Sequence, residues 1–139
     1  HRSEDRAQMF FHSSSYTANP IACAAANANL AIWRNEPVMQ RIASLGEGQA
    51  VQLKALATHR AVQNPRQTGT ITAFEVGEGS GYLSDLAPRL RAFFLEKGLL
   101  LRPLGNTIYL MPPYCLDALQ LDRIFAALHA AGEKFGLHA

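Results

Sequence analysis

The sequence predicts an α+β fold, with a small, largely antiparallel sheet covered on one side by helices. Its 139 residues, 48% hydrophobic and 17% charged, suit one ordinary soluble domain that can bury a core. Segments of helical periodicity alternate with short segments rich in β-branched and aromatic residues. The expected order is helix, helix, strand, helix, strand, strand, helix.

Two helices are expected in the first half of the chain. Asn19-Pro20 is a typical helix start, so a helix should run from there to about Arg34. Its apolar stretch, residues 21–33, is too short to span a bilayer, and we expect it to be buried. A second helix should run from Val38 to about His59, with one face formed by Val38, Ile42, Leu45, Gln49, Leu53 and Leu56.

The second half should alternate strands and helices. The segment "TGTITAFEVGEG" (68–79) predicts a strand with Ile71 and Ala73 on one face and Thr72, Phe74 and Val76 on the other. A third helix is expected over 84–97. Two short strands, "LLLRPL" (99–104) and "TIYLM" (107–111), should then be joined by a tight turn at residues 105–106.

The last helix should begin at Asp117, because Gln120 three residues later completes a capping box. The apolar residues that follow at helical spacing predict a buried face, formed by Leu121, Ile124, Phe125, Leu128 and Phe135.

Charge and cysteine content exclude several classes of protein. Thirteen Lys and Arg against eleven Asp and Glu give a net charge of +2, without a basic stripe, so a nucleic-acid partner is not expected. Cys23 and Cys115 fit neither a disulfide framework nor a metal site, and we expect both to be small buried side chains in a cytoplasmic protein. No membrane span and no metal ligands are predicted.

The first candidate site is the serine cluster of "HSSSYTANP" (12–20). Hydroxyl groups donate to phosphate oxygens, and a helix N-terminus adds free amides and the positive end of its dipole, so Ser13, Ser14 or Ser15 could bind an anion. Serines are equally common in loops that simply open a helix. Spacing alone leaves both interpretations open.

The second candidate is Arg102, near the end of an apolar segment and close to Tyr109 on the next strand. A guanidinium group there could hold a carboxylate or phosphate through two parallel hydrogen bonds. The alternative is an arginine in water at the sheet edge, with Tyr109 as a core aromatic residue.

Two of these motifs together, "HSSSYTANPIACAAA" and "RPLGNTIYLMPPYC", resemble the C-terminal part of the class III, pyridoxal-phosphate-dependent aminotransferases. The resemblance runs from about Phe10 to Phe135, and the second motif is most similar to the biotin-synthesis members. It implies the C-terminal small domain of a fold-type I enzyme. It also implies a homodimer that transfers an amino group from S-adenosylmethionine to 7-keto-8-aminopelargonate.

The resemblance also implies roles for single residues. Ser15, assisted by Ser14, would contact the phosphate of the pyridoxal 5'-phosphate bound to the neighbouring subunit. Arg102 would hold the substrate carboxylate, and Tyr109 would line that pocket. Ala18 stands where relatives often carry glycine.

The cofactor of this family is bound through a lysine amine. Lys54, Lys97 and Lys134 do not lie in the family's lysine context, so the resemblance places that lysine before residue 1. We therefore expect an N-terminal loop (1–18) and a C-terminal small domain (19–139) of a longer enzyme, inactive by themselves. Another class III ω-amino acid or diamine transaminase, or a stand-alone non-catalytic interaction domain, remains an alternative.

Overall fold

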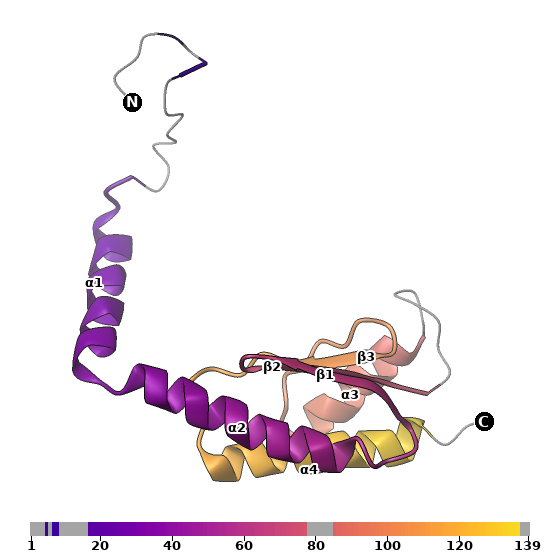
Figure 1. The fold of residues 1–139 in the computed structure, drawn as a ribbon. Helices are drawn as coiled ribbons and strands as arrows, with labels where there is room; N and C mark the ends of the chain where they lie inside the picture. The colour runs from indigo at the N-terminus through magenta and orange to yellow at the C-terminus, as the bar shows by residue number, and fades with distance from the viewer. Residues whose placement is uncertain (1–4, 6, 9–16, 78–84, 137–139) are drawn as a thin grey trace. The chain divides into compact units, whose positions relative to one another are not determined.

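The computed structural model describes residue 5 and residues 7–8, 17–77 and 85–136. The chain forms two compact units, residues 1–37 and 38–139. The first unit contains helix α1 (Pro20–Asn35), and the other helices and strands of the described residues lie in the second (Figure 1). The sequence-based division at residue 18 stays a prediction.

Helix α1 starts as predicted, because the Asn19 side chain caps it by accepting hydrogen bonds from the amides of Ile21 and Ala22. The prediction that this helix is buried is wrong for this chain, since none of its residues is buried. Alanine has the highest helix propensity, so the cap and the local sequence favour this helix without a buried face.

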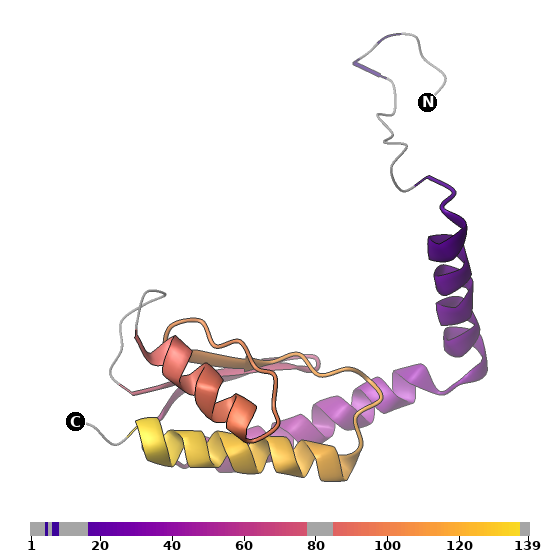
Figure 2. The ribbon, with the colours of Figure 1, turned by 180° about the vertical axis from the view of Figure 1, so that it is seen from behind.

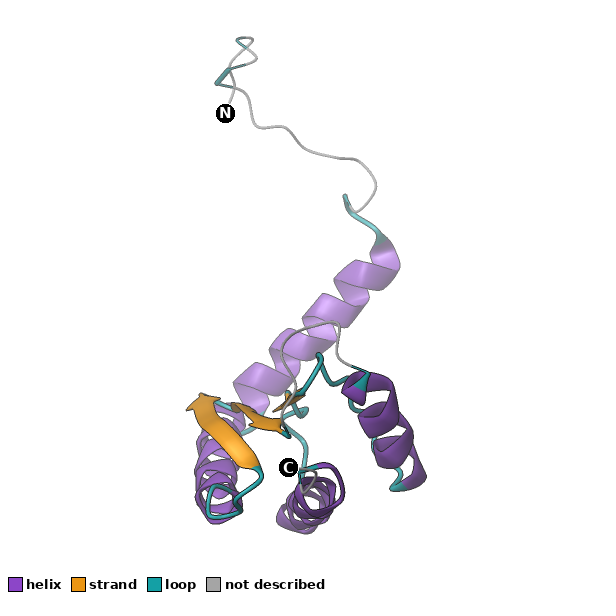
Figure 3. Ribbon diagram, turned by 90° about the vertical axis from the view of Figure 1, so that its right-hand side faces the viewer, coloured by secondary structure: helices purple, strands orange, loops and turns teal. Residues whose placement is uncertain are grey.

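The second unit is a three-stranded antiparallel sheet with helices on one face (Figures 1 and 2). Its strands β1 (Val62–Thr68), β2 (Ile71–Val76) and β3 (Thr107–Leu110) lie in that order. The helices are α2 (Val38–Leu56), α3 (Leu86–Glu96) and α4 (Ala118–Phe135). Helix α4 contacts both α2 and α3, and Figure 3 views α2 and α4 nearly end-on. The predicted α+β class is confirmed.

The faces of the sheet are those the alternation predicted. Thr72, Phe74 and Val76 of β2 are at most 2% exposed, whereas Ile71 is 42% exposed. Apolar side chains of the helices complete the core, among them Leu56, Leu90, Phe94, Phe125 and Leu128. Among the described residues, the helices of this unit cover one face of the sheet; we call the opposite face the helix-free face.

Strand β1 was not expected from the sequence, because "VQNPRQT" is polar and contains Pro65. It is an edge strand whose register shifts between Gln63 and Arg66. Asn64 at that bulge has φ 48°, a left-handed conformation that asparagine tolerates better than most residues. The observed order is therefore helix, helix, strand, strand, helix, strand, helix.

The predicted strand over 99–104 is wrong. Within the described chain this segment pairs with β3 only through Leu104 and Thr107, whose backbones exchange two hydrogen bonds of 2.9 Å. The tight turn at Gly105-Asn106 is confirmed, with Gly105 at φ 60°.

The remaining helices agree closely with prediction. Helix α2 keeps its predicted face, although it ends at Leu56 rather than near residue 59. Asp117 and Gln120 form the expected capping box of α4, with bonds of 2.7 and 3.0 Å.

No helix in the described part of the chain is long and apolar enough to cross a membrane. Cys23 and Cys115 are exposed free thiols, so the expectation of buried cysteines is wrong.

Candidate functional site

Ser14 and Ser15, the predicted phosphate contacts, lie outside the described residues. The start of α1 is described and offers no free first-turn amide. Asn19 accepts the amides of Ile21 and Ala22 through its side chain and that of Cys23 through its carbonyl, and Pro20 has no amide hydrogen. An anion bound near this helix would therefore depend on donors that precede its first turn.

Ala18, immediately before this cap, has φ 51°. This left-handed conformation is the one that glycine adopts without strain. Ala18 therefore adopts a backbone conformation that is more common for glycine than for alanine.

Arg102 and Tyr109 flank the turn that leads into β3. Each lies two residues from the paired Leu104 and Thr107. Before the turn, Arg102 is exposed and Pro103 is buried. After the turn, Ile108 is buried and Tyr109 is half-buried. On β3, Tyr109 alternates with the buried Ile108 and Leu110, so it faces the helix-free side.

Three polar side chains on the helix-free face, Asn64, Arg66 and Glu75, connect β1 to β2. The Arg66 guanidinium donates to Glu75 at 3.1 Å and to the Asn64 carbonyl at 2.9 Å, and the Asn64 side chain donates to Glu75 at 2.7 Å. The hydrogen bond from Asn64, and then Arg66, lowers the pKa of Glu75. Arg66 and Tyr109 are both register partners of Ala73, so they occupy one row across the sheet.

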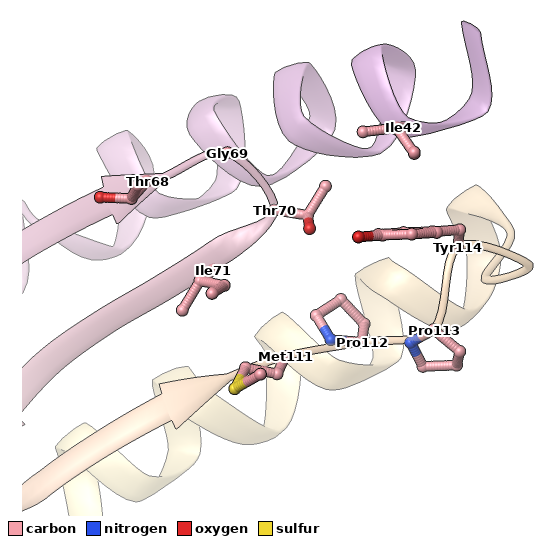
Figure 4. A pocket seen from close by; sticks show the side chains of 9 residues that line it. All are labelled: Ile42, Thr68, Gly69, Thr70, Ile71, Met111, Pro112, Pro113 and Tyr114. Atoms are coloured by element: carbon pink, nitrogen blue, oxygen red, sulfur yellow. The ribbon is translucent and has the colours of Figure 1, made fainter. Parts of the chain in front are cut away.

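The sequence did not predict the open pocket of about 360 Å³ at one end of the sheet, here called the Tyr114 groove (Figure 4). It lies between the β1–β2 turn, the segment after β3 and helix α2. The Thr70 and Tyr114 hydroxyls point toward each other across it. It is lined by Ile42, Thr68, Gly69, Thr70, Ile71, Met111, Pro112, Pro113 and Tyr114.

One wall of this groove is "MPPY" (111–114), part of the motif that carried the resemblance, so the sequence contained a partial signal for it. The other wall is the β1–β2 turn, which the sequence did not predict. Tyr109 and Met111 are two residues apart and so point to the same side of their chain segment. The groove therefore begins about 7 Å along the chain from Tyr109, one side-chain row beyond it.

The three lysines do not fit a covalent cofactor site. An amine that attacks a carbonyl carbon is usually activated by burial or by a neighbouring cation. Lys54 is exposed, and Lys97 and Lys134 are exposed with their ammonium groups 5.7 and 5.2 Å from the centre of the Phe93 ring. The described residues also contain no group of His, Cys, Asp or Glu that could hold a metal. All three lysines are therefore exposed, and none has the burial that commonly activates such an amine.

Comparison with known proteins identifies relatives for nearly the whole chain. The model of the family "Aminotransferase class-III" matches residues 2–131. An adenosylmethionine-8-amino-7-oxononanoate aminotransferase of Synechococcus elongatus is 43% identical over 86% of this chain and 28% of its own length. The protein of the same name from Helicobacter pylori is 41% identical over 87% of this chain and 28% of its own length.

Solved structures agree in fold. The adenosylmethionine-8-amino-7-oxononanoate aminotransferase of Methanocaldococcus jannaschii matches with a TM-score of 0.82 and 27% identity, over 93% of this chain and 31% of that one. A PLP-bound amine transaminase from an uncultivated Pseudomonas species matches with a TM-score of 0.79 and 29% identity. The match covers 92% of this chain and 30% of the transaminase. The chain thus spans less than a third of the length of these relatives.

Proposed function

The chain belongs to the class-III aminotransferase family, and we propose that it is the substrate-carboxylate-binding domain of a pyridoxal-phosphate-dependent enzyme of biotin synthesis. The intact enzyme would transfer an amino group from S-adenosylmethionine to 7-keto-8-aminopelargonate, giving 7,8-diaminopelargonate. The name shared by the Synechococcus and Helicobacter relatives supports this choice of substrates.

The observation that supports the proposal is that Arg102 is exposed and lies two residues before the Leu104–Thr107 pair at the β3 turn. A guanidinium there can bind a carboxylate through two parallel N–H donors. Its buried neighbour Pro103 restricts the backbone, and the Leu104–Thr107 pair fixes the turn. Tyr109, half-buried on β3, would form a wall of the same pocket and limit how the carboxylate is oriented.

The cofactor contacts proposed for this chain are those of Ser15 and, beside it, Ser14. Their hydroxyls would donate to the cofactor phosphate bound in the neighbouring subunit of a homodimer, which makes the dimer part of the site. Pyridoxal phosphate, when bound, supplies the electron-withdrawing ring that makes amino transfer feasible. The lysine that holds it would come from outside these residues, so the isolated chain should be inactive. Two free thiols are consistent with a cytoplasmic enzyme.

A second candidate function is a broader amine or ω-amino acid transaminase. An omega-aminotransferase of Caulobacter vibrioides is 32% identical over 82% of this chain and 26% of its own length. A carboxylate-binding arginine would serve that activity too, because its acceptors are also keto acids.

The two candidates differ in the amino donor. We expect the full-length protein, loaded with pyridoxal phosphate, to form 7,8-diaminopelargonate from S-adenosylmethionine and 7-keto-8-aminopelargonate. Transfer from amines or ω-amino acids to keto acids, without activity toward S-adenosylmethionine, would favour the second candidate. No transfer from any of these donors would contradict both.

A further inference from the structure

Three cationic side chains lie over two aromatic rings where α3 packs against α4 (Figure 2). The rings of Phe93 and Phe135 meet edge to face, with their centres 5.5 Å apart. The Lys134 ammonium lies 5.2 Å from the Phe93 centre and 5.6 Å from the Phe135 centre. The Arg89 guanidinium lies 5.5 Å from the Phe135 centre, and the Lys97 ammonium 5.7 Å from the Phe93 centre. We call Arg89, Lys97 and Lys134 the cation cluster.

Helix geometry and the rings determine the spacing of the cation cluster. Arg89, Phe93 and Lys97 are four residues apart, so they follow one face of α3 and its C-cap over a rise of about 12 Å. Lys134 reaches the same rings from α4. Because Lys134 shares a ring with each of the other two cations, its ammonium lies within about 11 Å of both charged groups.

No carboxylate neutralises the cation cluster. All three side chains are exposed, and none of them forms an ion pair with a described residue, although Glu96 and Glu133 are sequence neighbours of Lys97 and Lys134. The helix dipole favours Lys97 and Lys134, which lie at helix C-termini, but not Arg89, which lies in the first turn of α3. Three like charges therefore lie close together without a partner, which favours an anion among them.

The surroundings of the cation cluster indicate a small ligand with several negative charges. A protein partner would need exposed apolar surface at the centre of the contact, but Phe93 and Phe135 are only 7% and 8% exposed. A nucleic acid would need a longer basic surface, and the net charge of the chain is only +2. A chain of phosphate groups carries several charges in a small volume, and both arginine and lysine bind phosphate.

We propose that the cation cluster binds a short chain of phosphate groups, either free or carried by a nucleotide. Lys134 holds the middle of the chain, and Arg89 and Lys97 bind it from the two sides. The cluster belongs to the helices, whereas Tyr109 lies on the helix-free face of the sheet. This site is therefore separate from the carboxylate site of Arg102, and it does not rest on the proposed function.

Isothermal titration calorimetry tests this proposal, with inorganic triphosphate as the probe at low ionic strength, where exposed charges are screened least. The full-length protein would be loaded with pyridoxal phosphate, so that its cofactor-phosphate site is occupied. We expect one bound triphosphate per subunit, with an affinity that falls about fivefold in Lys134→Gln and in Arg89→Gln. The matched control is Arg91→Gln, an exposed arginine on α3 outside the cluster, and it should change the affinity less than about twofold.

The absence of saturable binding, or equal losses in Arg89→Gln and Arg91→Gln, would overturn the proposal. Adenosine triphosphate in the same titration distinguishes the source of the phosphates. Tighter binding that still depends on Lys134 assigns a nucleotide, and equal affinity assigns the phosphate chain alone.

Hydrogen exchange measured by mass spectrometry locates the bound triphosphate independently of these variants. We expect slower exchange in peptides from α3 and from the C-terminal half of α4 when triphosphate is added. Protection confined to any other part of the protein would overturn the proposal. Neither experiment measures amino transfer, so an enzyme that fails every donor test would refute the proposed function and leave this inference intact.

Discussion

Gln49 of α2 should be a destabilising residue, and Gln49→Leu should stabilise the protein. Its side chain is fully buried, and neither its amide nitrogen nor its oxygen has a hydrogen-bond partner among the described residues. A buried polar group without a partner costs about 1–3 kcal/mol. Leucine has a similar helix propensity and buries without a polar group. We therefore expect the free energy of unfolding to rise by about 2 kcal/mol.

The matched control is Gln52→Leu on the same helix, where the side chain donates to Asp122 of α4 at 2.6 Å. That bond is exposed, so its loss should lower the free energy of unfolding by only about 0.5–1 kcal/mol. Urea denaturation of the 139-residue chain, followed by circular dichroism, measures both variants. A loss of stability in Gln49→Leu comparable to that in Gln52→Leu would refute the reasoning, because it would mean that Gln49 makes a stabilising hydrogen bond.

Three further predictions concern the α4 cap, the sheet and the phosphate contact. Asp117→Ala should lower the free energy of unfolding by about 1 kcal/mol in urea titrations, and no change would mean that the capping box adds nothing. Folding lowers the pKa of Glu75. The ionised side chain therefore stabilises the folded state at pH values above the usual pKa of a glutamate, and this stabilisation is lost as the pH falls through the pKa of the folded state. Glu75→Gln should therefore make the free energy of unfolding depend less on pH between about pH 6 and 3. An unchanged dependence on pH would contradict this prediction. Ser15→Ala should weaken pyridoxal phosphate binding to the full-length apoprotein about tenfold in a titration, whereas Ser13→Ala should not; equal effects would leave only the loop interpretation.

Local signals predicted the helices well because their ends are defined by short-range chemistry. The caps at Asn19 and Asp117 each use side chains within three residues of the amides that they bind. Edge strand β1 could not be predicted in this way. Its pairing depends on β2, and its bulge at Asn64 accommodates Pro65 in a segment with little hydrophobic alternation.

The candidate site was only partly visible in the sequence. Motifs singled out Arg102 and Tyr109, and the structure places each of them two residues from the Leu104–Thr107 pair at the β3 turn. The Tyr114 groove was not predicted, because it forms only when the β1–β2 turn approaches "MPPY" from about forty residues away in the chain. The exposure of α1 could not be predicted either, since apolar composition does not show which surfaces this chain itself covers.

The central claim is that Arg102 binds the substrate carboxylate, and steady-state kinetics of full-length Arg102→Ala test it most directly. A charge-assisted hydrogen bond is worth about 1.5–3 kcal/mol, so its loss should raise the KM for 7-keto-8-aminopelargonate at least tenfold. Arg102→Lys should also be poor, because lysine lacks the planar fork. An unchanged KM for the keto acid in both variants would contradict the account.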